Sequence, residues 1–109
     1  MLEAFYTEIG ESEIRDLFPE DLVAGSRRSA AFYVQVFGGP PIYNNQFGNP
    51  MMRRRHFPFE IDEHKRLVWL ACFNRVVDRA ELEFRFPSDH IESFRLWLGG
   101  FSKWMVNVE

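Results

Sequence analysis

The most informative stretch of the sequence is Asn49-Pro-Met-Met-Arg-Arg-Arg-His-Phe-Pro-Phe59. Asn49 predicts the start of a helix, because its side-chain oxygen can accept the first unpaired backbone N–H groups. Pro50 suits the first helical position, and Pro58 is expected to end the helix and to push Phe57 out of the helical conformation. A helix of about two turns is not stable alone in water. We therefore expect something to hold it, and a bound ligand that is both anionic and apolar would do so.

Outside this stretch, apolar residues recur at the spacing of amphipathic helices, and no internal repeat is present. The expected helices span residues 2–17, with a bend near Gly10, residues 23–37, and a stretch that begins after a cap at Asp62 and ends between Asp78 and Phe84. Residues 40–48 show no periodicity and are expected to form a loop.

The last helix is expected to begin at residues 87–89, where Asp89 and Glu92 have the spacing of a capping box. Gly99-Gly100 in its middle costs roughly 1 kcal/mol per glycine relative to alanine, so we expect a bend or a close contact there. Apolar and charged residues alternate over residues 82–86, but no partner strand is apparent. We interpret them as the end of the preceding helix and a loop, and the fold class as all-α.

Length and composition restrict the possible functions. A chain of 109 residues is expected to form one domain, residues 1–109, and a net charge of −3 argues against a nucleic-acid partner. The single Cys72 allows no internal disulfide, and the longest apolar run, Leu67–Phe73, is too short to span a membrane. We expect a soluble, cytoplasmic protein whose 12 phenylalanines form a dense core or the walls of a ligand slot.

Few residues are candidates for chemistry. His64 and His90 lie among charged residues and are expected to be solvated, whereas His56 is preceded by arginines and followed by aromatic residues. No second ligand lies at zinc-site spacing from His56. Cys72 lies on an apolar helical stripe, where a small core residue is the better interpretation. A hydrolase that uses His56 with a carboxylate lacks a recognisable carboxylate pair.

One combination of motifs extends from Phe5 to the end of the chain. Its members are Phe5-Tyr6, Leu17-Phe-Pro-Glu-Asp21, Phe32, Phe37-Gly-Gly-Pro40, Tyr43, Gln46, Gly48 through Phe59, and Trp69-Leu-Ala-Cys72. In this combination the chain resembles a truncated hemoglobin of the second group. The resemblance implies an all-α, globin-like fold, a shortened two-over-two helical sandwich, in which the usual first helix is expected to be absent.

The resemblance also implies a heme b site with His56 as the iron ligand, its other ring nitrogen bonded to a backbone carbonyl or to water. Tyr6 and Trp69 would donate hydrogen bonds to the bound ligand, and Phe18 would pack against the heme. The remaining heme contacts that the resemblance implies are Gly25, Ser29 and Phe32 on the ligand side, Tyr43, Arg53 and Arg55 at the propionates, and Met52, Phe59 and Phe73. The arginines could instead only keep the short helix soluble, which is the interpretation we favour for Arg54.

The function implied is the binding of oxygen, carbon monoxide, nitric oxide or another small ligand at the iron. Two activities stay open, the oxidation of nitric oxide and a reaction with peroxide. A partner reductase and a homodimer also stay open, and we expect no membrane partner. The alternative is a globin-derived sensor or interaction module that binds heme weakly or not at all.

Overall fold

The computed structural model describes residues 1–108, except for the side chain of Arg53. Within this part the chain forms helices and no strands, so the expected all-α class is confirmed. The elements are α1 (Leu2–Gly10), η1 (Arg15–Leu17), α2 (Leu22–Val36), α3 (Ile42–Phe47), α4 (Met52–His56), α5 (Glu63–Val77), α6 (Ala80–Phe84), η2 (Ser88–His90) and α7 (Ile91–Met105). None of the described helices is both long and apolar enough to cross a membrane.

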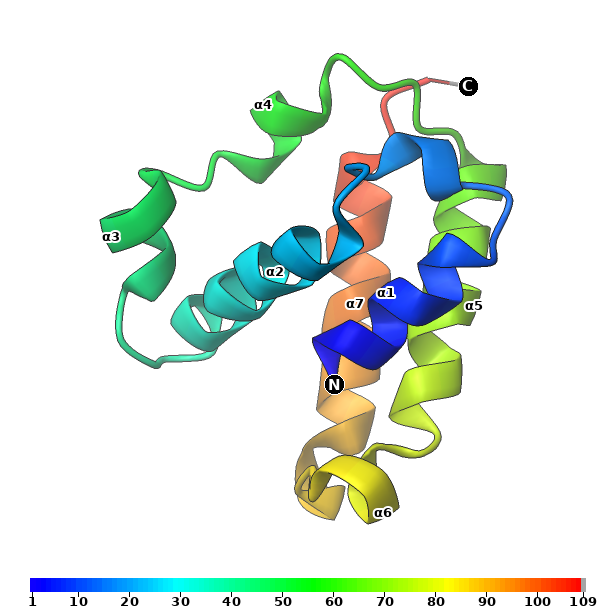
Figure 1. The fold of residues 1–109 in the computed structure, drawn as a ribbon. Coiled ribbons are helices and arrows are strands. Elements are labelled where there is room, and N and C mark those ends of the chain that lie inside the picture. The colour runs from blue at the N-terminus through cyan, green and yellow to red at the C-terminus, as the bar shows by residue number, and fades with distance from the viewer. Residues whose placement is uncertain (109) are drawn as a thin grey trace.

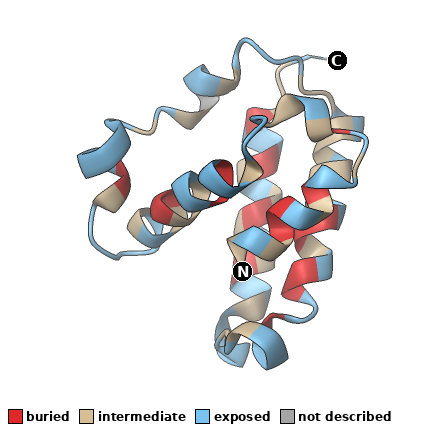
Figure 2. Cartoon of the chain, viewed as in Figure 1, coloured by how far each residue is buried: buried red, intermediate tan, exposed pale blue. Residues whose placement is uncertain are grey.

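Two helix pairs form the body of the molecule. Helix α1 packs against α2, α5 packs against α7, and α1 crosses α5 to join the pairs (Figure 1). The buried residues gather on the inner faces of these four helices (Figure 2). Ile9, Phe73 and Leu98 are completely buried there, at 0% exposure. Helices α3 and α4 lie outside this body, on a segment that runs past α2 and returns to α5.

Helices α2 and α5 begin at aspartate caps. The Asp62 carboxylate accepts a hydrogen bond from the backbone N–H of Lys65 at 2.8 Å, which confirms the predicted cap. The Asp21 carboxylate accepts one from Ala24 at 3.1 Å in the same way. Each carboxylate satisfies one of the unpaired N–H groups of a first helical turn.

The first predicted helix is shorter than expected, because α1 ends at Gly10 and only a turn of 3-10 helix follows. The Ser12 hydroxyl donates to the carbonyl of Ile9 at 2.8 Å and accepts from the N–H of Ile14 at 3.3 Å. A serine that satisfies backbone groups in this way competes with continued helix. The prediction of a helix through residue 17 was therefore wrong.

The predicted loop over residues 40–48 contains a helix, α3. Tyr43 anchors it, since its ring is only 1% exposed and meets the ring of Phe32 on α2. The side chain of Gln35 accepts a hydrogen bond from the backbone N–H of Asn44 and donates one to its side chain, both at 3.0 Å. Contacts with α2 thus stabilise a helix that has no periodic pattern of its own.

Helix α4 begins later than predicted. Met51, in the left-handed conformation with φ of 41°, precedes it, and Asn49 provides no side-chain cap. Phe57 stays in the helical region, at φ −55° and ψ −35°, although Pro58 follows. The expected cap at Asn49 and the expected non-helical conformation of Phe57 were therefore both wrong. Contacts from other segments hold α4.

One expectation near the C-terminus was also wrong. Helix α7 begins after His90 without a side-chain cap, so Asp89 and Glu92 form no capping box. Gly99-Gly100 lies within one continuous helix, and a Cβ atom at either glycine would have no heavy atom within 4 Å. Residues 80–84 form the separate short helix α6.

Candidate functional site

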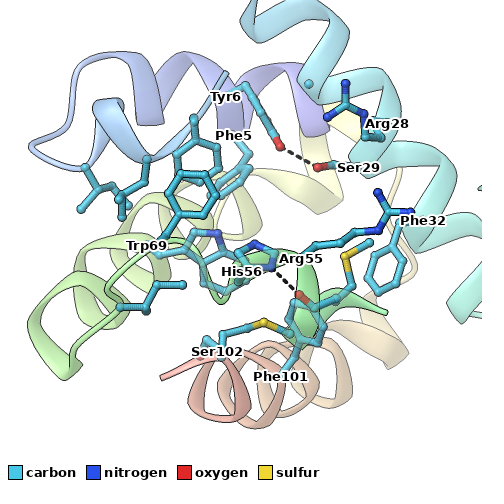
Figure 3. A pocket seen from close by; sticks show the side chains of 18 of the residues that line it. Phe5, Tyr6, Arg28, Ser29, Phe32, Arg55, His56, Trp69, Phe101 and Ser102 are labelled. Atoms are coloured by element: carbon cyan, nitrogen blue, oxygen red, sulfur yellow. Dashed lines mark hydrogen bonds between the residues drawn. The ribbon is translucent and has the colours of Figure 1, made fainter. Parts of the chain in front are cut away.

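A cavity of about 580 Å³ lies between the α1–α2 pair and helices α4, α5 and α7. This volume is in the range of small-molecule and cofactor sites. Eleven of the residues that the resemblance implied line it: Tyr6, Phe18, Gly25, Ser29, Phe32, Tyr43, Met52, Arg55, His56, Phe59 and Trp69. In Figure 3 the His56 ring lies between the Tyr6–Ser29 pair on one side and Phe101 and Ser102 of α7 on the other.

The His56 ring is fixed by its own helix. Its Nδ1 lies 2.6 Å from the backbone carbonyl oxygen of Met52, one helical turn earlier. A carbonyl can only accept, so Nδ1 carries the proton of the neutral ring and Nε2 carries the lone pair. No hydrogen bond of the described residues and side chains involves Nε2. The ring can therefore act as an Nε2 ligand with a defined tautomer.

The segment after His56 is tied to the end of α7. The Asn107 side-chain amide donates to the carbonyl of Phe59 at 2.8 Å, and its oxygen accepts from the N–H of Ile61 at 2.9 Å. The backbone N–H of Asn107 donates to the carbonyl of Ile61 at 3.0 Å. These contacts hold the α4–α5 connection against α7.

Tyr6 reaches the cavity from α1. Its hydroxyl lies 2.6 Å from the Ser29 hydroxyl, and either oxygen can be the donor. Burial raises the pKa of Tyr6, while the hydrogen bond with Ser29 and the charge of Arg28 lower it. Tyr6 therefore keeps its proton at neutral pH. A Cβ atom at Gly25 would come within 2.9 Å of the Tyr6 ring, so α2 accepts this ring because glycine stands there.

Trp69 forms part of the aromatic wall contributed by α5. Its ring meets Phe5 edge-on at 5.6 Å between centroids and Phe73 at 5.3 Å. Phe73 itself does not line the cavity, because it is fully buried in the core behind Trp69 and Phe5. The structure therefore does not bring Phe73 to the site. The side chain of Arg53 lies outside the described residues.

The cationic side chains at the cavity have different partners. The Arg55 guanidinium donates to the carbonyls of Pro50, Asn49 and Phe47 at 2.6, 3.0 and 3.2 Å, so it organises the α3–α4 connection. By contrast, Arg28 lines the cavity, lies over the ring of Phe47 at 5.6 Å, and forms no salt bridge within the described residues.

Sequence reasoning missed Arg28 as a site residue, although its spacing was informative. Gly25, Arg28, Ser29 and Phe32 occupy positions i, i+3, i+4 and i+7 of one helix face. Once three of these positions face a cavity, the fourth is expected to face it too. Further lining residues that were missed include Phe5, Tyr33, Phe101, Ser102 and Met105.

The family model described as "Bacterial-like globin" matches residues 1–99. The chain belongs to this globin family. It is 34% identical over 84 residues to the group 2 truncated hemoglobin YjbI of Bacillus subtilis, which covers 76% of this globin. The aligned part is 64% of the length of that relative, slightly less than two thirds.

Solved structures agree with the family. This globin superposes on the group II truncated hemoglobin from Bacillus anthracis with a TM-score of 0.85 at 31% identity, over 98% of this chain and 80% of the other. The truncated oxygen-avid haemoglobin from Bacillus subtilis gives a TM-score of 0.85 at 32% identity, over 97% and 87% of the two chains. The resemblance to group II truncated hemoglobins and the two-over-two fold are thereby confirmed.

Proposed function

We propose that this globin binds heme b in the cavity, with His56 as the iron ligand, and takes up dioxygen, carbon monoxide or nitric oxide there. The contact that carries the proposal is the 2.6 Å hydrogen bond between His56 Nδ1 and the Met52 carbonyl. It fixes the tautomer whose Nε2 can bind a metal, as a carbonyl behind a ligating histidine does in metal sites. The similarity to a haemoglobin described as oxygen-avid supports the same function.

The residues around the cavity fit a flat, apolar group that carries carboxylates. Phe18, Phe32 and Trp69 offer aromatic walls, and the Arg28 guanidinium has no carboxylate partner within the described residues. A guanidinium binds carboxylates well because its N–H groups match both oxygens. Since Arg55 is bonded to three backbone carbonyls, Arg28 is the side chain that we expect to meet a propionate.

When bound, heme would supply an iron atom that accepts small gas ligands. The residues of this chain would determine how polar the surroundings of the gas ligand are. If Ser29 donates to Tyr6, the phenolic proton of Tyr6 remains available to an oxygen-bearing ligand, and the Trp69 indole can only donate. Two such donors would slow the release of a polar ligand. Nitric oxide oxidation, reaction with peroxide and a partner reductase stay predictions.

The visible absorption spectrum after addition of hemin tests this function. We expect a sharp Soret band for the wild type and its loss or shift in His56→Ala. His64→Ala is the matched control, because the His64 side chain is 67% exposed, pairs with Glu13 and does not line the cavity. It should give the wild-type band. No Soret band in the wild type would favour the globin-derived module without heme, and an unchanged band in His56→Ala would contradict the assigned ligand.

A further inference from the structure

Tyr33 on α2 is held rigidly by aromatic neighbours. The centroid of its ring lies 5.6 Å from that of Trp97, 5.8 Å from Phe73 and 6.3 Å from Phe94, all edge-on. Phe32 adds a fourth edge-on contact at 5.5 Å. Contacts of this kind favour one ring orientation and leave the phenol little freedom to turn away.

Tyr33 is one of the residues at the wall of the cavity. Among the described residues and side chains, its hydroxyl takes part in no hydrogen bond. Among the described side chains, no oxygen or nitrogen atom is both fully buried and without a hydrogen-bond partner. The hydroxyl must therefore face a space that can hold a partner.

That space lies inside the molecule. Burial raises the pKa of Tyr33 far above its ordinary value, and the nearby phenol of Tyr6 raises it further. The ring packs against Phe73 of α5 and against Phe94 and Trp97 of α7, so the side chain extends from α2 toward these helices. Tyr33 and Tyr6 both line the cavity, and the raised pKa of Tyr33 keeps its hydroxyl protonated at neutral pH.

We propose that the Tyr33 hydroxyl is a further hydrogen-bond donor to the small, oxygen-bearing ligand that the cavity takes up. This inference rests on the proposed function and adds a specificity-determining residue from α2 to Tyr6 and Trp69. The Tyr6 hydroxyl is already paired with Ser29, whereas the Tyr33 hydroxyl gives up no hydrogen bond to a described residue when it donates. A ligand that accepts its hydrogen bond gains affinity, because a hydrogen bond is stronger in a low-dielectric interior than in water.

The test compares Tyr33→Phe with wild type after loading with hemin, reduction and addition of carbon monoxide or oxygen. Loss of a donor near the ligand should raise the infrared stretching frequency of bound carbon monoxide. It should also speed oxygen dissociation roughly threefold to tenfold, the effect of one net hydrogen bond. Trp97→Phe is the control, because Trp97 packs on the Tyr33 ring but does not line the cavity. It keeps the hydroxyl and should give wild-type values.

A second measurement separates this role from a structural one. In the heme-free protein, Tyr33→Phe should unfold at the wild-type temperature, because the hydroxyl makes no protein hydrogen bond. A clear fall in that temperature, or an unchanged stretching frequency and dissociation rate in the loaded variant, would overturn the inference while the wild-type Soret band stands. Absence of that band would overturn the proposed function and this inference together.

Discussion

The close approach of Tyr6 to Gly25 determines how α1 and α2 pack at the cavity. A Cβ atom at residue 25 would lie 2.9 Å from the Tyr6 ring and 3.2 Å from Pro19. We expect Gly25→Ala to lower the free energy of unfolding by about 1–2 kcal/mol, because overpacking outweighs the better helix propensity of alanine. Urea denaturation of the heme-free protein measures this difference.

Gly99→Ala provides the comparison for that substitution. Both glycines lie within long helices, but a Cβ atom at residue 99 would have no heavy atom within 4 Å. Alanine should therefore stabilise α7 by about 1 kcal/mol. If the two variants changed stability in the same direction, the close contact between Gly25 and Tyr6 would not be the determining factor.

For single residues, the resemblance to truncated hemoglobins predicted which residues would reach the cavity better than which partners they would have. The resemblance implied one site for His56, Tyr6 and Trp69, and all three line the same cavity. The Tyr6–Ser29 hydrogen bond joins residues 23 positions apart and depends on how two helices cross. Phe73 lies on the same helix as Trp69, but it packs in the core and not at the cavity. The spacing of residues along a helix cannot distinguish a core position from a cavity wall.

Asp62 and Asp89 were both predicted to cap a helix, but only Asp62 does so. Asp62 accepts the hydrogen bond from Lys65, while α7 begins without a side-chain cap. Asp62→Ala should therefore lower the free energy of unfolding by about 1 kcal/mol. Asp89→Ala should change it by less than about 0.5 kcal/mol. Thermal unfolding of both variants measures the difference, and equal losses would show that Asp89 caps α7 after all.

The elements that sequence reasoning missed depend on contacts distant in the chain. Helix α2 was predicted to within one residue at each end, since glycines and prolines follow it, and the start of α5 was predicted from its Asp62 cap and apolar stripe. Helix α3 has neither signal, and it forms because Tyr43 packs on α2 and Gln35 binds Asn44. The early end of α1 depends instead on the single hydroxyl of Ser12.

The cavity depends on the arrangement of the whole molecule, because its walls come from six helices, α1, α2, α3, α4, α5 and α7. The sequence suggested that a bound ligand would hold the short helix with His56. In the structure Arg55 binds three carbonyls before that helix, and Asn107 binds the segment after it. The protein therefore positions His56 through its own contacts, and the proposed heme would meet a ring that is already oriented.

The measurement that tests the proposed iron ligand most directly is the Soret spectrum of hemin-loaded His56→Gly with and without added imidazole. If His56 Nε2 binds the iron, the glycine variant should lack the wild-type band, and free imidazole should restore it by entering the space that the side chain left. A wild-type band in His56→Gly without imidazole would show that another residue holds the iron and would contradict the account.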